Sequence, residues 1–187
     1  MSFSVGPTRR IQAGDTPDLN DGQLSRGIAA SLNLARGNAC YLVDGNITLA
    51  TLALSIAGHR PFVPTESVDN SSGGAGALEA SGVEAPQRVA LLVEASSTAL
   101  NPGDYVKPSN NADGTVERWV PTTDDQRNKY AVYLGKEAAL LDRATTTPFA
   151  ETLTAGIVPD QTLTPTATAA DNVGWFQLIE NQGGAEV

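Results

Sequence analysis

Turn-forming residues divide this sequence into short pieces, and that feature restricts its fold more than any other. Turn signals break the sequence about every 8 to 12 residues, a spacing typical of β-sandwiches and β-barrels. Short runs with alternating apolar residues lie between them, and long helical patterns are scarce. The pattern predicts a mainly β protein, built of small antiparallel β-barrel or sandwich modules with at most one or two short helices.

Two Asp-Gly pairs are the clearest turn signals. Asp44-Gly45 separates CYLV from NITL, and Asp113-Gly114 separates DYVKP from TVERW. Glycine accepts the positive φ that a tight hairpin turn needs, so each pair predicts a hairpin. We expect further strands in RPFVP, RVALLV, YAVYLG and VGWFQLIE, the last being apolar on both faces and therefore central or at an interface.

The best helical pattern lies in residues 21–37. Leu24, Ile28 and Leu32 recur four residues apart, and Gly37 provides a stop signal. The spacing predicts a helix over this range, although Gly27 inside it is unfavourable for a helix.

Changes in composition suggest a division of the chain into four parts. Residues 1–20 are rich in turn formers and weakly patterned, which predicts an extended N-terminal arm. Residues 71–82 are mostly small and lack an apolar period, which predicts a flexible linker. The linker would separate an N-terminal β-rich module (21–70) from a C-terminal β-barrel or sandwich domain (83–187).

The two halves of the chain also resemble each other. The order ACYLVDGNIT followed by RPFVPTE corresponds to DYVKPSNNADGTVE followed by YAVYLGKE. Each half gives a strand, an Asp-Gly turn, a strand and a further apolar strand. Two related β-modules would explain this order, and chance similarity between hairpins is the alternative.

Charge and cysteine content bear on partners and location. The net charge is -9 and the pI is near 4.4, with no cluster of Lys and Arg, which argues against nucleic acid as a partner. Cys40 is the only cysteine, so no intrachain disulfide can form. No signal peptide and no run of about 18 apolar residues is evident, so we expect a protein made in the cytoplasm without a membrane span.

The acidic stretch around Asp113 invites comparison with a calcium-binding EF-hand loop. Aligning Gly114 with the invariant glycine places Asn111 and Asp113 at ligand positions, but Ser109 and Val120 occupy the first and twelfth positions. Both positions normally carry carboxylates. We therefore interpret the stretch as a hairpin loop and expect no metal site.

Catalytic patterns are also weak. Cys40 lies in an apolar strand pattern that favours a buried thiol, and His59 in GHRPF suits a residue that hydrogen-bonds a turn. A Cys-His pair or a Ser-His-Asp triad is not excluded by sequence, but G-x-S-x-G is absent. We predict no catalytic, metal or cofactor-binding residues and no cofactor.

Three other features have a structural and a functional interpretation. SSGGAG lacks the Lys-Ser/Thr of a phosphate-binding loop and is interpreted as linker. Asp124 and Asp125 form a carboxylate pair that could serve acid–base chemistry, but their hydrophilic surroundings favour a solvated loop. Trp119 and Trp175 would stack on sugars if exposed, whereas packing in a core or interface is the commoner use of tryptophan.

The second half resembles the decoration or cement proteins of tailed-bacteriophage capsids. The resemblance rests on ALNPGDYVKP, the Asp-Gly turn with GTVERW, YAVYLGKEAALL, and a Thr-rich segment ending in GWFQLIE. It covers roughly residues 89–180, with a looser echo in residues 38–68, and its motifs are of a generic β type. The family has no catalytic residues to carry over, and this chain departs from it by the long N-terminal section.

The resemblance implies a non-enzymatic shell protein on the outer face of an icosahedral head. Its partners would be the major capsid protein and neighbouring copies of itself, as a trimer or dimer, with neither nucleic acid nor membrane involved. An arm over residues 1–20 would lie across a neighbour and order on binding. The alternatives are another virion component (tail, fibre or baseplate) or a carbohydrate-binding module.

Overall fold

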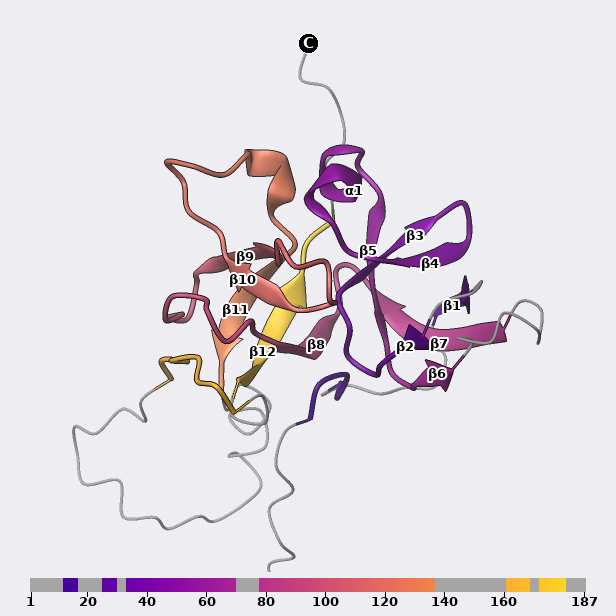
Figure 1. Cartoon of the computed structure of the whole chain (residues 1–187), viewed down its shortest axis with the longest axis horizontal. Coiled ribbons are helices and arrows are strands. Elements are labelled where there is room, and N and C mark those ends of the chain that lie inside the picture. Colours follow the sequence, from indigo (N-terminus) through magenta and orange to yellow (C-terminus); the bar gives the residue numbers. More distant parts are fainter. Residues whose placement is uncertain are drawn as a thin grey trace, which may run out of the picture.

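The computed structural model describes residues 12–16, 25–29, 33–69, 78–136, 161–168 and 172–180. Within these ranges the chain is mainly β, with one short α-helix and one 3-10 helix. Figure 1 shows two groups of strands, one formed by the earlier part of the sequence and one by the later part. The predicted fold class, small β-modules with few helices, is confirmed.

The first module is a closed barrel of five strands in the order β1-β4-β3-β5-β7. The β1–β4 pair is parallel and every other pair is antiparallel. The helix α1 (Leu52–Ile56) connects β4 to β5, and its N-cap is Thr51. The barrel strands are β1 (Ser25–Ala29), β3 (Cys40–Val43), β4 (Asn46–Leu49), β5 (Arg60–Pro64) and β7 (Leu78–Glu84), and β2 (Asn33–Leu34) pairs with β6 (Val68–Asp69) beside them.

The second module is a five-stranded sheet in the order β10-β9-β11-β12-β8, with antiparallel pairs throughout. Beyond the end of β8, Val93 forms a parallel bridge with Val116 of β10, so the two outer strands of the sheet meet. The 3-10 helix η2 (Gln126–Asn128) connects β10 to β11. The strands are β8 (Arg88–Leu92), β9 (Tyr105–Pro108), β10 (Val116–Arg118), β11 (Ala131–Gly135) and β12 (Val173–Leu178).

The two modules have the same topology. When the strands of each are numbered along the chain, both rings follow the order first, third, second, fourth, fifth. In both rings the first and third strands run parallel, and a short helix joins the third strand to the fourth. The predicted internal similarity aligns the β3–β4 hairpin with β9–β10 and aligns β5 with β11, which is the correspondence that the strand orders give.

A recurring turn adds to this correspondence. Residues 35–38 precede β3 and residues 101–104 precede β9. In each turn the first residue's carbonyl accepts from the fourth N–H, and the fourth side chain accepts from the first N–H. Gly37 and Gly103 occupy the third position with φ of 80° and 95°, a left-handed conformation that suits glycine.

A continuous core joins the modules. Its buried residues include Tyr41 and Val63 from the first module with Tyr130 and Phe176 from the second. The Tyr41 and Tyr130 rings meet edge to face, with centroids 5.5 Å apart. Helices α1 and η2 also lie against each other, as Figure 1 shows at one end of the molecule. The described parts of the two modules therefore pack as one body.

The Tyr130 hydroxyl provides the polar contacts in this packed region between the two modules, which we call the joint. It accepts a hydrogen bond from the backbone N–H of Cys40 (3.0 Å) and lies 2.9 and 3.0 Å from the carbonyls of Cys40 and Phe62. Burial raises the pKa of Tyr130 well above its usual value, so the hydroxyl keeps the proton that it donates.

Residues 12–16 cover part of the edge of β8. The Gly14 N–H donates to the Ala90 carbonyl (2.7 Å), and the Ala90 N–H donates to the Asp15 carbonyl (2.8 Å). Asp15 also forms an ion pair with Arg36 of the first module (2.6 Å). Pairing at an edge removes exposed backbone groups that invite unwanted strand addition. Residues 12–16 of the predicted arm are therefore docked on their own chain, and the rest of residues 1–20 lies outside the described residues.

Two predictions about elements are wrong. The range 21–37 contains the strands β1 and β2 where a helix was predicted. Residues 78–82 of the predicted linker belong to β7, which pairs with both β1 and β5. These five residues close the first barrel, and residues 71–77 lie outside the described part. Both predicted hairpins are confirmed, and β12 lies between β11 and β8 as expected of a central strand.

Candidate interaction surface

An aromatic cluster lies at one end of the second module. Tyr105 begins β9, Trp119 follows β10, and Lys129 precedes β11. The two rings meet edge to face with centroids 6.0 Å apart. The Lys129 Nζ lies 4.1 Å from the Tyr105 ring centroid and 4.3 Å from that of Trp119, within the range of cation–π attraction. We call these three residues the aromatic platform.

The platform is only partly covered. Tyr105 is 37 % exposed and Val120, which follows Trp119, is 38 % exposed, whereas Trp119 is 6 % exposed. Val106 and Val116 of the same hairpin are buried in the core. Tyr105 therefore differs from the other large apolar residues of this hairpin, because it faces solvent at the edge of the molecule.

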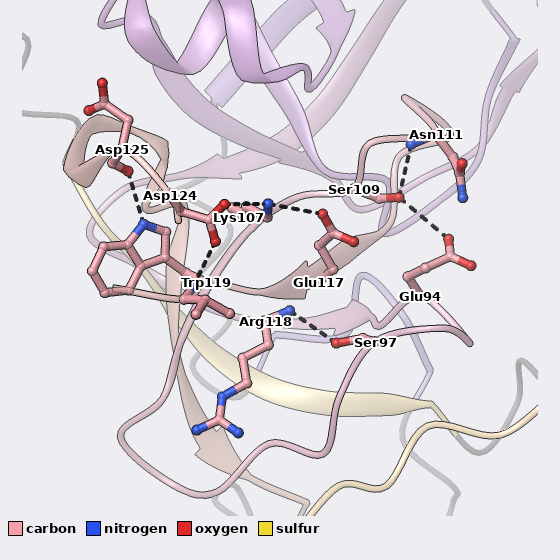
Figure 2. Close-up of polar contacts among 11 residues, drawn as sticks. Glu94, Ser97, Lys107, Ser109, Asn111, Glu117, Arg118, Trp119, Asp124 and Asp125 are labelled. Atoms are coloured by element: carbon pink, nitrogen blue, oxygen red, sulfur yellow. Dashed lines mark hydrogen bonds and ion pairs between the residues drawn. The ribbon is translucent and has the colours of Figure 1, made fainter. Parts of the chain in front are cut away.

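The loop after β10 holds the platform in position. The Trp119 indole N–H donates to the Asp125 carbonyl (2.9 Å), and the Asp124 carboxylate accepts from the Val120 N–H (2.7 Å). Figure 2 shows the Trp119 indole beside this loop, joined to Asp125, with Asp124 directed toward Lys107. These bonds fix the indole at the end of β10 and leave Tyr105 as the outward-facing ring.

Lys107 is held between two carboxylates. Its Nζ lies 2.7 Å from Asp124 and 3.2 Å from Glu117, and all three side chains are largely buried. Burial alone would lower the pKa of Lys107, but the two carboxylates outweigh it and raise that pKa. Asp124 is thus committed to an ion pair, which differs from the solvated loop that the sequence suggested.

Asp125 has a separate role in the same loop. Its carboxylate caps η2 by accepting from the Arg127 N–H (2.8 Å) and pairs with the Arg127 guanidinium (2.7 Å). The side-chain hydrogen bond from Arg127, followed by the backbone one, lowers the pKa of Asp125 to about 2. Asp124 and Asp125 each have their own partners and do not form a paired acid–base site.

The Asp113-Gly114 loop contacts the first module. The Ala39 N–H donates to the Gly114 carbonyl (2.7 Å), and the Asn38 side chain lies 3.4 Å from the Asp113 carbonyl. The Asp113 carboxylate accepts from the N–H and the hydroxyl of Thr115 (3.0 and 2.6 Å). Burial would raise the pKa of Asp113, but these hydrogen bonds outweigh it and lower the pKa.

The opposite side of this loop carries the Glu94 carboxylate. Glu94 lies 3.0 Å from the Thr115 hydroxyl, whose proton is nearer to Asp113, and Ser109 accepts from the Asn111 N–H (3.1 Å), as Figure 2 shows in part. In the described part of the chain, no group of three or more His, Cys, Asp or Glu side chains is arranged to hold a metal ion. The described contacts of the loop are those of a hairpin that joins two modules.

The remaining candidates lie apart from the platform. Cys40 is buried in β3, and burial raises the pKa of its thiol above the usual value. His59 is half-buried in the turn between α1 and β5. No hydrogen bond between these two described residues is present to make a Cys-His pair.

The tryptophans present little surface for a sugar. Trp119 and Trp175 are each 6 % exposed, and the Trp175 indole N–H is buried with no hydrogen-bond partner among the described residues. Sugar stacking needs an open ring face. The SSGGAG stretch lies outside the described residues.

Sequence reasoning did not find the platform as a unit. Tyr105 and Trp119 occur at the two ends of the predicted hairpin, and their partnership follows from strand register. The Trp119 N–H donates to the Tyr105 carbonyl (2.9 Å), which places the two residues opposite each other. Lys129 lies just before β11, so its position beside the two rings depends on the pairing of β9 with β11.

Comparisons of the chain with protein-family models, with curated proteins and with solved structures give no match. None of the helices in the described ranges is long and apolar enough to cross a membrane. The platform and the joint between modules are thus the features on which an account of function has to rest.

Proposed function

We propose that the protein is a non-enzymatic structural component of a virion, a capsid cement protein that binds the outer surface of an assembled phage head. It would stabilise contacts between capsomers, together with neighbouring copies of itself. Its production would take place in the host cytoplasm and its final location would be the virion.

One observation carries the proposal. The motifs that resemble cement proteins form consecutive strands β9, β10, β11 and β12 of a single barrel-like module. The looser echo in residues 38–68 falls on the matching strands of the first module.

The structure supports the proposal in two further ways. The described parts of the two modules share one core, so contacts made by either module would hold the same packed body. The partly exposed Tyr105 at the platform offers an aromatic contact residue of the kind enriched in protein interfaces. A cement gains from many weak contacts repeated over a lattice, because each contact raises the effective concentration for the next.

The test is co-sedimentation of the purified protein with heads assembled from the coat protein of the same virus. We expect saturable binding to assembled heads, weak binding to unassembled coat subunits, and heads that survive a higher temperature when the protein is bound. Equal binding to free subunits, or no binding to heads, would contradict the proposal. Immunogold labelling of whole particles separates a head position from the alternative of a tail, fibre or baseplate component.

A further inference from the structure

The contact between the two modules has a loop side and a turn side. The loop side is the Asp113-Gly114 tip of the second module. The turn side is residues 35–38 of the first module, together with Ala39. A Cβ at Gly114 would overlap the Asn38 side chain, so backbone and side chain meet here without a gap.

Because the two modules have the same strand order, each side of this contact has a matching segment in the other module. The counterpart of the Asp113-Gly114 loop is the Asp44-Gly45 turn between β3 and β4. The counterpart of the 35–38 turn is the 101–104 turn before β9. Asp44, Gly45 and Gly103 are exposed, and a Cβ at either glycine would have no described atom within 4 Å.

Strand register identifies the matching residues on the turn side. The Ala50 N–H donates to the Ala39 carbonyl (2.9 Å), and the Trp119 N–H donates to the Tyr105 carbonyl (2.9 Å) at the same place in the second ring. Ala39 and Ala50 therefore correspond to Tyr105 and Trp119. The two alanines are buried in the core shared with the second module, whereas Tyr105 is 37 % exposed.

From this correspondence we propose that the Asp44-Gly45 turn of one copy docks on the aromatic platform and the 101–104 turn of a second copy. The same two elements, a hairpin tip and the turn that precedes a strand, would then meet between molecules as they meet within one molecule, with Asp104 in the place of Asn38. Because the two surfaces differ, the association is head to tail and builds a closed ring or an open chain.

Size and charge agree with this occupant. Inside the molecule, the seven-residue connection 109–115 meets the small Ala39. Between molecules, the two-residue turn would meet the large side chains of Tyr105 and Trp119. Lys129 places a cation on the platform and Asp44 a carboxylate at the tip of the turn, and Asp104, which stands where the first module has Asn38, is paired with Arg118 (3.3 Å). Opposite charges at the rim of an interface favour the correct register.

The inference deepens the proposed function, because it rests on the contact between copies that a lattice-bound cement requires. The two ideas can nevertheless fail separately. Self-association is measured in solution without heads, whereas head binding is measured with the protein dilute.

The experiment is sedimentation velocity of the full chain from low micromolar to millimolar concentration. Wild-type protein should form oligomers as concentration rises. Lys129→Glu and Asp44→Lys should each weaken association about tenfold or more, because like charges then meet at every contact. An equimolar mixture of the two variants should recover it, since every contact between unlike copies then joins opposite charges: the native pair in one direction and the two exchanged side chains in the other.

Lys136→Glu is the matched control, because Lys136 follows the opposite end of β11 and makes the same charge change away from the platform. It should associate like the wild type, and thermal melts should confirm that every variant is folded. Tyr105→Ser tests the same surface without a charge change and should also reduce association. A wild-type monomer throughout the range, or oligomers that none of these platform and turn variants weakens, would overturn the proposal.

Discussion

The two modules share one strand order but differ in how each ring is completed. In the first module, β1 pairs with β4 and with β7, so strand pairing closes the barrel. In the second module, the ring closes through the single bridge between Val93 and Val116, and residues 12–16 pair with Ala90 on the same strand. A strand order can thus be kept while one ring is closed by its own strands and the other is completed by added segments.

The comparison extends to the surfaces that the modules present. At matching positions, the first module carries Ala39 and Ala50 beneath its neighbour, and the second carries Tyr105 and Trp119 at an outer end. Small side chains let another module approach closely, and large ones build a surface of their own. The end of the first module that packs against its neighbour and the matching, outer end of the second module therefore differ mainly in side-chain size.

The largest expected effect tests whether the modules depend on each other. Phe62 lies in the first barrel and Phe176 in the core of the second, and both are fully buried. Phe62→Ala and Phe176→Ala should each destabilise the protein by about 3 to 5 kcal/mol, because each leaves a cavity. Urea unfolding followed by circular dichroism should show one transition for both. A variant that unfolds in two steps would mean that the modules are independent.

The next effect concerns the Tyr130 hydroxyl. Tyr130→Phe keeps the ring but leaves the buried Cys40 N–H without its partner, which should cost about 1 to 3 kcal/mol. Tyr133→Phe is a control in β11, which begins just after Tyr130, since the Tyr133 hydroxyl donates to the Gln161 carbonyl away from the first module. Only Tyr130→Phe should speed amide hydrogen exchange in β3 and β5. Equal exchange rates in both variants would mean that the Tyr130 hydroxyl does not stabilise the joint.

A smaller effect compares matching glycines in the two repeated turns. Gly37 and Gly103 both have positive φ, so alanine at either should cost about 1 to 2 kcal/mol. A Cβ at Gly37 would also overlap Ala13 and Gly14, whereas Gly103 is open. Gly37→Ala should therefore be the more destabilising, by about 1 kcal/mol or more. Equal losses in thermal melts would mean that residues 12–16 do not press against the 35–38 turn.

The smallest effect is a pH response confined to the loop after β10. The pKa of Asp125 in the folded protein, about 2, lies below its ordinary value of 3.8. The contribution of Asp125 to folding stability is therefore present above pH 3.8 and is lost as the pH falls toward 2. Arg127→Ala removes the main cause and should move the pKa of Asp125 toward its ordinary value. A carboxyl titration by NMR measures the change, and an unmoved pKa would assign the shift to another cause.

Local chemistry made part of the fold predictable. Asp44-Gly45 was interpretable because a two-residue hairpin turn needs positive φ, and the structure gives 51° and 80° there. The β12 prediction rested on apolar residues on both faces, and this strand is central to its sheet. In β11, Ala131 and Tyr133 are the buried pair, and the sequence alone did not tell which of the two alternating sets would be buried.

Two errors have clear physical reasons. Residues four apart share a face in a strand as well as in a helix, so Leu24, Ile28 and Leu32 did not distinguish the two, and Ile28 is exposed in β1. Small residues in 78–82 suggested a linker, but Gly82 is small because a Cβ there would overlap the Phe62 ring. Composition alone does not reveal that a neighbour fills the space.

The joint and the platform were beyond sequence reasoning because they depend on distant pairing. Tyr130 and Cys40 lie 90 residues apart in the chain, and no local pattern marks their hydrogen bond. The repeat was visible as a similarity, but the difference between its inner and outer ends required knowledge of which surfaces are covered.

The claim that the two modules form one folding unit has a direct test in the residues that the chain already carries. Its only cysteine, Cys40, is buried in the first module, and its two tryptophans, Trp119 and Trp175, lie in the second. A thiol reagent then reports on the first module and fluorescence on the second across one urea titration. The account predicts coincident midpoints, and reaction of Cys40 at a urea concentration where the fluorescence is still native would contradict it.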